Sequence, residues 1–497
     1  MPRHRSSRAV LAGATAVVGV ASFVLLATGA TAQEEPTWSQ FQGGPGHPGV
    51  LADGPQPPFR VRWTLPAPAG EGLSPAIVAD DLAVSVGEEA VYGIDIATGA
   101  VEWQVRRDGG SLSVPAIGTG ERGRILVFIE GPAPTSATGS GSASATPSGA
   151  ASTAPASASA SPAPVDESTA PSTLVAIALS DQRELWRTEL VASSRSGVTI
   201  DAGVALAGDR DGNLYAVSLA DGTLLWTASV EGAINAPVAV ADARVYAVVR
   251  QPNDLGVTVA AFDLESGKAA WPTDSQAVSI AGSILSVGEG ELIFGSIDRF
   301  IRGLDVADGS ERWATLARSL FFPSTAPALA HGTVFLADFG GGLYRIDPSD
   351  GARLWSFQFN ELVIRSSPVV SGSTVLVGLN DGRLAAVDVD SGHLIWEGSP
   401  SEGLLGTIAL DTDAAIAVKG GSHAGLIAFE HDPDGALVDV ASPTELDIGT
   451  TLWRYTVAAA SVFVIAFFPA FLIRRRVGSD DLSDTTDSPE LVDEDPT

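Results

Sequence analysis

The sequence predicts an all-β fold, an eight-bladed β-propeller of four-stranded antiparallel blades, together with one C-terminal transmembrane helix. One observation is a returning phrase that ends in tryptophan, as in LYAVSLADGTLLW, LYRIDPSDGARLW and LAAVDVDSGHLIW. Another is its period of about 42 residues, which is typical of repeat architectures. The third is that each repeat alternates short apolar runs with Asp-Gly or Ser-Gly turns, the pattern of antiparallel hairpins. Such sheets bury both faces only when they stack radially as the blades of a ring.

Tryptophan stands at one position of the repeat on the predicted outer strand. A large flat side chain there can pack against the neighbouring blade, so we expect these tryptophans to be structural. One gap in the series is about twice the period, because residues 131–172 insert a Ser/Thr/Ala/Pro-rich run that buries too little apolar surface to fold. The eight positions are Trp63, Trp103, Trp186, Trp226, Trp271, Trp313, Trp355 and Trp396.

The propeller is predicted over residues 38–440, and its two ends complete one blade. Eight sets of the first three strands can be counted, but the last set has Val438 where the others have tryptophan. The segment RVRWTLP at 60–66 supplies a strand with the missing tryptophan. We therefore expect this N-terminal strand to close the eighth blade and leave no open edge.

Two turn positions recur beside the tryptophans. Glycine at the first tolerates a positive φ, and aspartate at the second is expected to hydrogen-bond the local backbone. Gln182 replaces the glycine in the second unit, where we expect a different turn. The glycines are Gly99, Gly222, Gly267, Gly309, Gly351 and Gly392, and the aspartates are Asp95, Asp263, Asp305, Asp347 and Asp388.

Two apolar segments indicate a membrane location. Residues 1–32 have the layout of a signal peptide that ends in Ala30-Thr31-Ala32, or of an uncleaved N-terminal membrane segment. Residues 452–473 contain roughly 19 consecutive uncharged residues, enough for a transmembrane helix, although a buried core helix is the alternative. Three arginines at 474–476 place the acidic, disordered tail 474–497 in the cytoplasm. With 441–451 as the juxtamembrane linker, the propeller lies outside the cytoplasm.

Composition limits the possible functions. The net charge of -30 argues against nucleic-acid binding, which needs clustered basic residues. The chain has no cysteine, which excludes disulfides, thiolate metal sites and a cysteine nucleophile. The turn with Asp209, Asp211 and Asn213 resembles part of a calcium loop but lacks the distal glutamate, so an ordinary hairpin turn is the favoured interpretation. The sequence assigns no catalytic, cofactor-binding or metal-binding residue.

Aromatic and polar residues beside the blade-joining loops are candidates for contact with a partner. They are Phe321, Phe322 and Asn360. The alternative for the phenylalanines is burial beneath neighbouring loops. The insert 131–172 is either an O-glycosylated stalk or a bare loop.

The repeated phrase resembles the pyrroloquinoline-quinone-type propeller repeat, and WSQFQGGPGHPGV at 38–50 is similar to the usual start of that family. The family includes quinoprotein dehydrogenases and the scaffold lipoprotein of the outer-membrane assembly machinery. The resemblance to the dehydrogenases implies a quinone in the pore, a calcium ion, a catalytic carboxylate and a vicinal cysteine pair, and this chain has no cysteine pair and no matching set of acids.

We therefore expect a membrane-anchored, extracytoplasmic, monomeric propeller at the plasma membrane. It would bind protein partners of the cell envelope as a scaffold or sensor, without a cofactor. The alternative is a quinone-dependent dehydrogenase.

Overall fold

The computed structural model describes residues 38–68, 71–121, 123–131, 170–251, 257–271, 278–279, 283–288, 290–321, 325–363, 365–398 and 403–441. The chain divides into two compact units, Met1–Glu35 and Pro36–Thr497, and all described residues belong to the second. The described part is all-β apart from two short 3-10 turns, η1 (Phe41–Gly43) and η2 (Gly421–His423).

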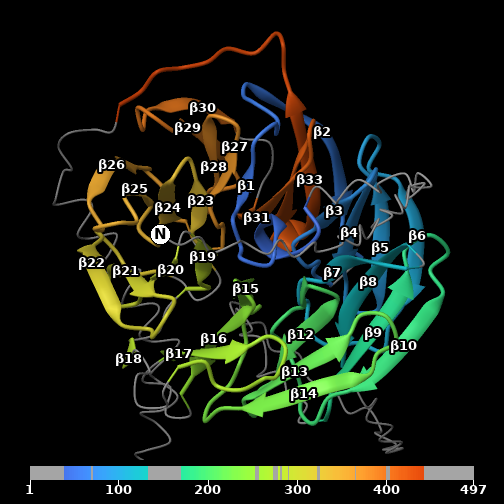
Figure 1. Ribbon diagram of the computed structural model, residues 1–497. Coiled ribbons are helices and arrows are strands. Elements are labelled where there is room, and N and C mark those ends of the chain that lie inside the picture. Colours follow the sequence, from blue (N-terminus) through green and yellow to red (C-terminus); the bar gives the residue numbers. More distant parts are fainter. Residues whose placement is uncertain are drawn as a thin grey trace, which may run out of the picture. The chain divides into compact units, whose positions relative to one another are not determined.

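Eight antiparallel sheets follow one another along the chain and form the eight predicted blades (Figure 1). Blade 1 contains β3 (Ile77–Ala79), β4 (Leu82–Val86), β5 (Ala90–Asp95) and β6 (Val101–Arg106). Blade 2 contains β7 (Ala116–Gly120), β8 (Gly123–Glu130), β9 (Thr173–Ala178) and β10 (Glu184–Glu189). Blade 3 contains β11 (Thr199–Asp201), β12 (Val204–Gly208), β13 (Asn213–Ser218) and β14 (Leu224–Ser229). Blade 4 contains β15 (Ala239–Ala241), β16 (Arg244–Arg250), β17 (Val257–Asp263) and β18 (Val278–Ser279).

The remaining blades repeat this order. Blade 5 contains β19 (Ser286–Gly288), β20 (Glu291–Gly295), β21 (Phe300–Asp305) and β22 (Glu311–Leu316). Blade 6 contains β23 (Ala328–Ala330), β24 (Thr333–Ala337), β25 (Gly342–Ile346) and β26 (Arg353–Gln358). Blade 7 contains β27 (Val369–Ser371), β28 (Thr374–Gly378), β29 (Leu384–Asp388) and β30 (Leu394–Gly398), with β1 (Val50–Leu51) parallel to β27. Blade 8 contains β31 (Leu405–Leu410), β32 (Ala415–Lys419), β33 (Gly425–His431) and β2 (Phe59–Pro66).

The predicted closure of the ring is present. Strand β2, from the N-terminal region, pairs antiparallel with β33 and forms the outer strand of blade 8. The first strand of each blade lies nearest the centre, as the labels β15, β19 and β23 show in Figure 1. These inner strands are short and mostly buried, whereas outer strands such as β6 and β14 carry many exposed residues. The apolar core therefore lies between blades and along their inner strands.

The chain that follows β33 turns back along the rim of blade 7. The backbone N–H of Val438 donates to the carbonyl of Ile395 at 2.7 Å, and Val440 forms an antiparallel bridge with Leu394. Val438, which stands at the tryptophan position of the repeat, thus lies along β30 rather than in blade 8. The C-terminal end of the propeller leaves the ring at this rim.

Several predictions lie outside the described residues. They are the signal peptide 1–32, the transmembrane segment 452–473, the tail 474–497, Phe322, and most of the insert 131–172 and the linker 441–451. Within the described ranges, no helix has the length and apolar character needed to cross a membrane. The transmembrane helix therefore stays a prediction.

Candidate functional site

At most seams, a repeated tryptophan hydrogen-bonds one blade to the next. At six seams, the indole Nε1 donates to a backbone carbonyl of the following blade at distances between 2.5 and 3.0 Å. Because a buried indole N–H needs an acceptor, this bond fixes the orientation of the ring as well as its position. The pairs are Trp63 with Ile96, Trp186 with Leu219, Trp226 with Leu264, Trp271 with Val306, Trp313 with Pro348, and Trp355 with Val389.

The turn glycines lie under these rings. Gly99 has a φ of +73°, and a Cβ built on it would come within 2.6 Å of Trp63. Gly222 has a φ of +76°, and its Cβ would come within 2.8 Å of Trp186. At these two seams glycine is therefore favoured for two independent reasons, the left-handed backbone and the close ring. The neighbouring turn aspartates accept local backbone bonds as predicted, for example from Thr98 N to Asp95 Oδ1 at 2.6 Å.

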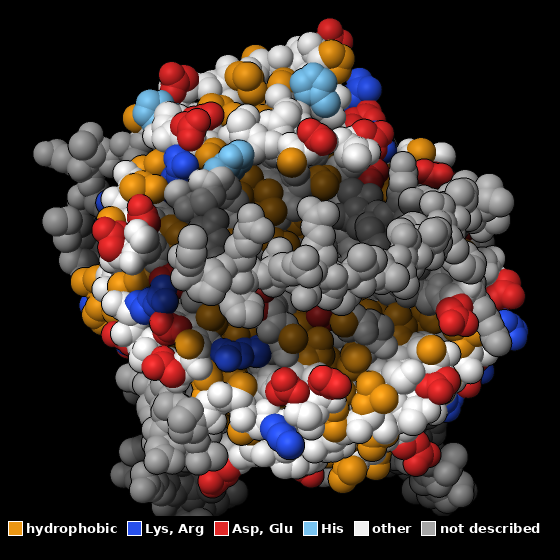
Figure 2. Space-filling model, in the orientation of Figure 1, with side chains coloured by type: hydrophobic (Ala, Val, Ile, Leu, Met, Phe, Trp, Pro, Cys, Tyr) orange, Lys and Arg blue, Asp and Glu red, His pale blue; other side chains and the backbone are white. Residues whose placement is uncertain are grey.

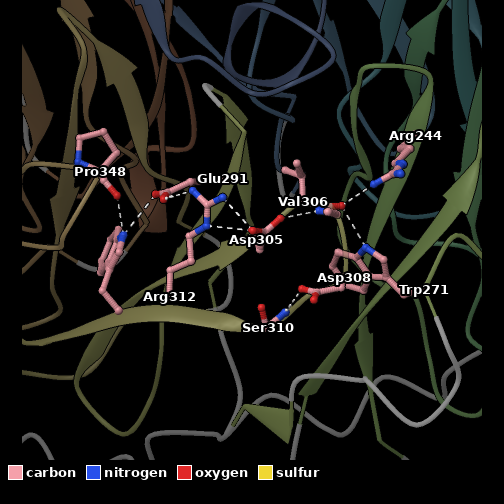
Figure 3. A network of polar contacts seen from close by, with 11 residues as sticks. Arg244, Trp271, Glu291, Asp305, Val306, Asp308, Ser310, Arg312 and Pro348 are labelled. Carbon is pink, nitrogen blue, oxygen red and sulfur yellow. Dashed lines mark hydrogen bonds and ion pairs between the residues drawn. The ribbon is translucent and has the colours of Figure 1, made fainter.

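Figure 3 shows this arrangement between blades 4 and 5. The carbonyl of Val306 accepts from Trp271 Nε1 at 3.0 Å and from Arg244 Nη1 at 2.6 Å. Next to it, Arg312 Nη1 binds the buried carboxylate of Glu291 at 2.9 Å. The Arg312 side chain is 44% exposed and Glu291 is buried, and both belong to blade 5, so this ion pair stabilises that blade, whereas the bonds to the Val306 carbonyl cross the seam.

Two of the eight seams depart from the pattern, and the first lies between blades 1 and 2. Gln182 has a φ of 55°, and its N–H donates to Ala178 O at 2.9 Å, as Gly99 N–H does to Asp95 O. The expectation of a different turn is therefore wrong, because glutamine adopts the same left-handed turn. Its Nε2 donates to Leu179 O at 3.0 Å, the carbonyl equivalent to those bound by tryptophan elsewhere. Nε1 of Trp103 in blade 1 is buried and has no hydrogen-bond partner in the described part of the chain.

The seam between blades 7 and 8 is closed by an aromatic contact. The ring of Trp396 packs edge-on against Phe59 of β2, with centroids 5.3 Å apart. Phe59 belongs to the N-terminal strand that completes blade 8 by pairing with β33. Here aromatic packing with the closing strand joins the blades.

The centre of the ring contains residues 38–49, which we call the axial segment. It passes the inner strands in order, and equivalent residues of seven blades donate a backbone N–H to it at 2.7–2.9 Å. Six of these bonds go to backbone carbonyls of the axial segment, and the seventh goes to the side chain of Gln40. In the sequence, the only sign of the axial segment is its similarity to the usual start of the family. The donors and acceptors are Val78 to Trp38, Ile117 to Ser39, Ile200 to Gln40, Val240 to Pro45, Val287 to Gly46, Leu329 to Pro48, and Val370 to Gly49.

Side chains of the axial segment are buried within the ring. Trp38 is 1% exposed and Phe41 4% exposed. His47 is fully buried, its Nδ1 contacts the carbonyl of Leu285 at 2.8 Å, and burial lowers its pKa to about 4. The imidazole of His47 is therefore neutral at pH 7. Its Nε2, and both side-chain amide atoms of Gln42, are buried and have no hydrogen-bond partner among the described residues.

The predicted partner-facing residues do not form one surface. Phe321 is 1% exposed and packs in a cluster with Tyr344 and Ile293, so it is buried beneath neighbouring elements and does not face a partner. Asn360 is exposed. Figure 2 shows acidic and basic side chains interspersed over the visible rim rather than gathered in a patch of one sign.

The turn that resembles a calcium loop is an ordinary hairpin. The carboxylate of Asp209 is buried and accepts from the N–H groups of Asp211 and Asn213, from Asn213 Nδ2 and from the hydroxyl of Tyr215. Burial and the bond to Asp209 raise the pKa of Tyr215 to about 12, so the hydroxyl remains a donor. With its oxygens bound by these donors, Asp209 is a structural residue. No group of three potential metal ligands occurs among the described residues.

The axial segment decides whether the quinone implied by the family resemblance fits. Such a cofactor would stack in the centre of the ring, where the inner N–H groups already bind the chain itself. Phe41 and Trp38 fill the adjoining apolar space. The residues present therefore do not fit a quinone at this depth of the ring.

Comparisons with known proteins agree on the fold. A family model described as outer membrane protein assembly factor BamB matches residues 170–318 and 255–420. A search of curated proteins found no match. Among solved structures, BamB from Moraxella catarrhalis is 15% identical with a TM-score of 0.51, covering 75% of this chain and 100% of that chain.

Enzymes share the same architecture. The quinohemoprotein alcohol dehydrogenase ADHIIG from Pseudomonas putida HK5 is 11% identical with a TM-score of 0.58, covering 82% of each chain. A europium-containing methanol dehydrogenase is 13% identical with a TM-score of 0.55, covering 79% of this chain and 91% of that chain. At these identities the similarity shows the fold alone.

Proposed function

The chain belongs to the family described as outer membrane protein assembly factor BamB, and from this premise we propose that it is a non-catalytic, protein-binding scaffold of the cell envelope. A single C-terminal membrane segment would hold the propeller outside the cytoplasm, as the charge pattern around residues 452–473 indicates. The partner would be another envelope protein.

The observation that carries the proposal is the occupied centre of the ring. A quinone-dependent propeller enzyme of the kind that the resemblance implies needs a central site for its cofactor and an acid–base group beside it. Here the axial segment takes up that space with backbone hydrogen bonds to seven blades. What the ring offers to other molecules is its rim and its loop faces, which suits a binding role.

The first experiment tests binding. A photo-crosslinking residue is placed at Asn360, beside a blade-joining loop, and the matched control at Leu225, which is 50% exposed on the outer strand β14. We expect a discrete crosslinked protein band from intact cells for the Asn360 variant and not for the control. Equal crosslinking at both positions would indicate random collisions and count against a loop-face partner.

The second experiment tests the enzyme alternative. Purified full-length protein is mixed with pyrroloquinoline quinone, calcium and a primary alcohol or sugar. We expect neither oxidation of the substrate nor a rise in the melting temperature. A bound cofactor at a hundredfold excess over its Kd would add about 2.7 kcal/mol to stability, a shift that is readily measured. Turnover together with quinone-dependent stabilisation would replace the scaffold proposal with the dehydrogenase alternative.

A further inference from the structure

We propose that the inner strands of the ring form a binding site for an extended, glycine- and proline-rich peptide, and that residues 38–49 are its resident ligand. This inference goes beyond the proposed scaffold function and stands on the contacts of the axial segment alone. Its failure would leave the question of an envelope partner open.

Recognition in this site is carried by the backbone. Equivalent N–H groups, about one period apart in the chain, converge on the centre from seven blades. Each needs an acceptor because a buried, unpaired N–H costs about 1–3 kcal/mol. A peptide that presents a series of carbonyls satisfies them all, whereas a compact small molecule cannot reach seven donors around a ring.

Two glycines set the closest approach of the peptide. A Cβ built on Gly46 would lie 3.0 Å from the carbonyl oxygen of Val287. Gly49 has a φ of +64°, and its Cβ would lie 2.9 Å from the Cβ of Ala328. Valine at both positions would push the peptide away from the N–H groups of blades 5, 6 and 7, whereas a single unbranched side chain at Gly46 needs a shift of only a few tenths of an ångström.

Side chains of the axial segment fix which of its residues faces which inner strand. Gln40 Oε1 accepts from Ile200 N at 2.8 Å, and Gln40 Nε2 donates to Ile200 O at 3.1 Å. The amide therefore pairs with β11 as a neighbouring strand would. Together with the buried rings of Trp38 and Phe41, it specifies a ligand of the form Trp-x-Gln-Phe followed by glycines.

The segment joins the rest of the chain through an exposed turn, where it can be cut. Ala52 and Asp53 are exposed and lie between β1 and the proline-rich approach to β2. A protease site inserted between them in the full-length protein converts the axial segment into a non-covalent ligand. Its exchange is then measured by the fluorescence anisotropy of a labelled synthetic peptide of residues 36–52.

We expect the labelled peptide to bind the cut protein and not the uncut protein. A matched peptide with Gly46→Val and Gly49→Val should bind at least about tenfold more weakly, a loss of about 1.4 kcal/mol. Equal binding of the two peptides would overturn the proposal, and so would the absence of binding by a cut ring that keeps its β-sheet circular dichroism. Unfolding of the ring on cleavage would also count against an exchangeable ligand.

A second variant tests the placement without cutting the chain. Since the protein contains no cysteine, Gly46→Cys with Val287→Cys introduces the only possible disulfide. The Cβ built on Gly46 lies 3.4 Å from Val287 Cγ1, which is compatible with a bridge. We expect a crosslinked 46–287 peptide in the mass spectrum of the oxidised protein. Two free thiols in the folded, oxidised variant would show that the segment does not occupy the ring.

Discussion

Replacing Gln182 with glycine should stabilise the propeller, because it restores the seam between blades 1 and 2, which departs from the repeat. A side chain in the left-handed region costs about 1–2 kcal/mol relative to glycine, while the added freedom of glycine in the unfolded chain costs about 0.4–1 kcal/mol. The change also frees the carbonyl of Leu179, to which Trp103 Nε1 can then donate, as in six other seams. Satisfying that buried donor contributes about 1–3 kcal/mol, and losing the half-exposed glutamine bond removes about 0.5–1.5 kcal/mol. The net expected gain is about 1–2 kcal/mol.

A double-mutant cycle in urea separates these effects. Trp103→Phe removes a buried indole N–H that has no partner in the described residues, so the loss of this group should relieve its desolvation cost in the parent protein. In the Gln182→Gly background, the same change should cost about 1 kcal/mol more, because it now removes a hydrogen bond. A coupling energy near zero, or destabilisation by Gln182→Gly alone, would refute the reasoning.

Three further outcomes are expected. In a denaturation experiment, Trp226→Ala should lower the free energy of unfolding by about 3 kcal/mol and Trp226→Phe by about 1 kcal/mol. Only the change to alanine removes an aromatic ring from the half-buried seam. Equal losses for the two variants would mean that the ring does not pack there. Since the folded-state pKa of His47 lies at about 4 and the unfolded value at 6.5, the unfolded state binds the extra proton between these pH values. Stability should therefore fall by about 3 kcal/mol as the pH drops from 6.5 to 4, a loss removed by His47→Gln but not by the exposed control His331→Gln. A reporter active only in the cytoplasm should work when fused after Thr497 and fail after Asp447, and the reverse pattern would invert the membrane topology.

The sequence was informative wherever the structure repeats. Each blade is one local unit with a fixed turn, so the spacing of Trp226 and Gly267 and their equivalents predicted the blades, their number and the closing strand at residues 60–66. These features depend on side chains with strong preferences: glycine for the left-handed turn, tryptophan for the seam, and aspartate for the turn bond. Nearest-neighbour packing of identical units makes such signals recur in register.

Tertiary structure alone decided what lies in the centre and at the exceptional seams. The axial segment binds inner strands through main-chain groups between residues as far apart as Gly49 and Val370, and backbone hydrogen bonds leave no side-chain pattern to detect. Phe321 could face a partner or the core, and only the packing of Tyr344 around it settles the matter. Likewise, Gln182 takes the glycine conformation because the surrounding seam enforces the turn against its intrinsic preference. Local preference determines a repeating unit, whereas the occupant of a space enclosed by eight such units depends on contacts that no single unit contains.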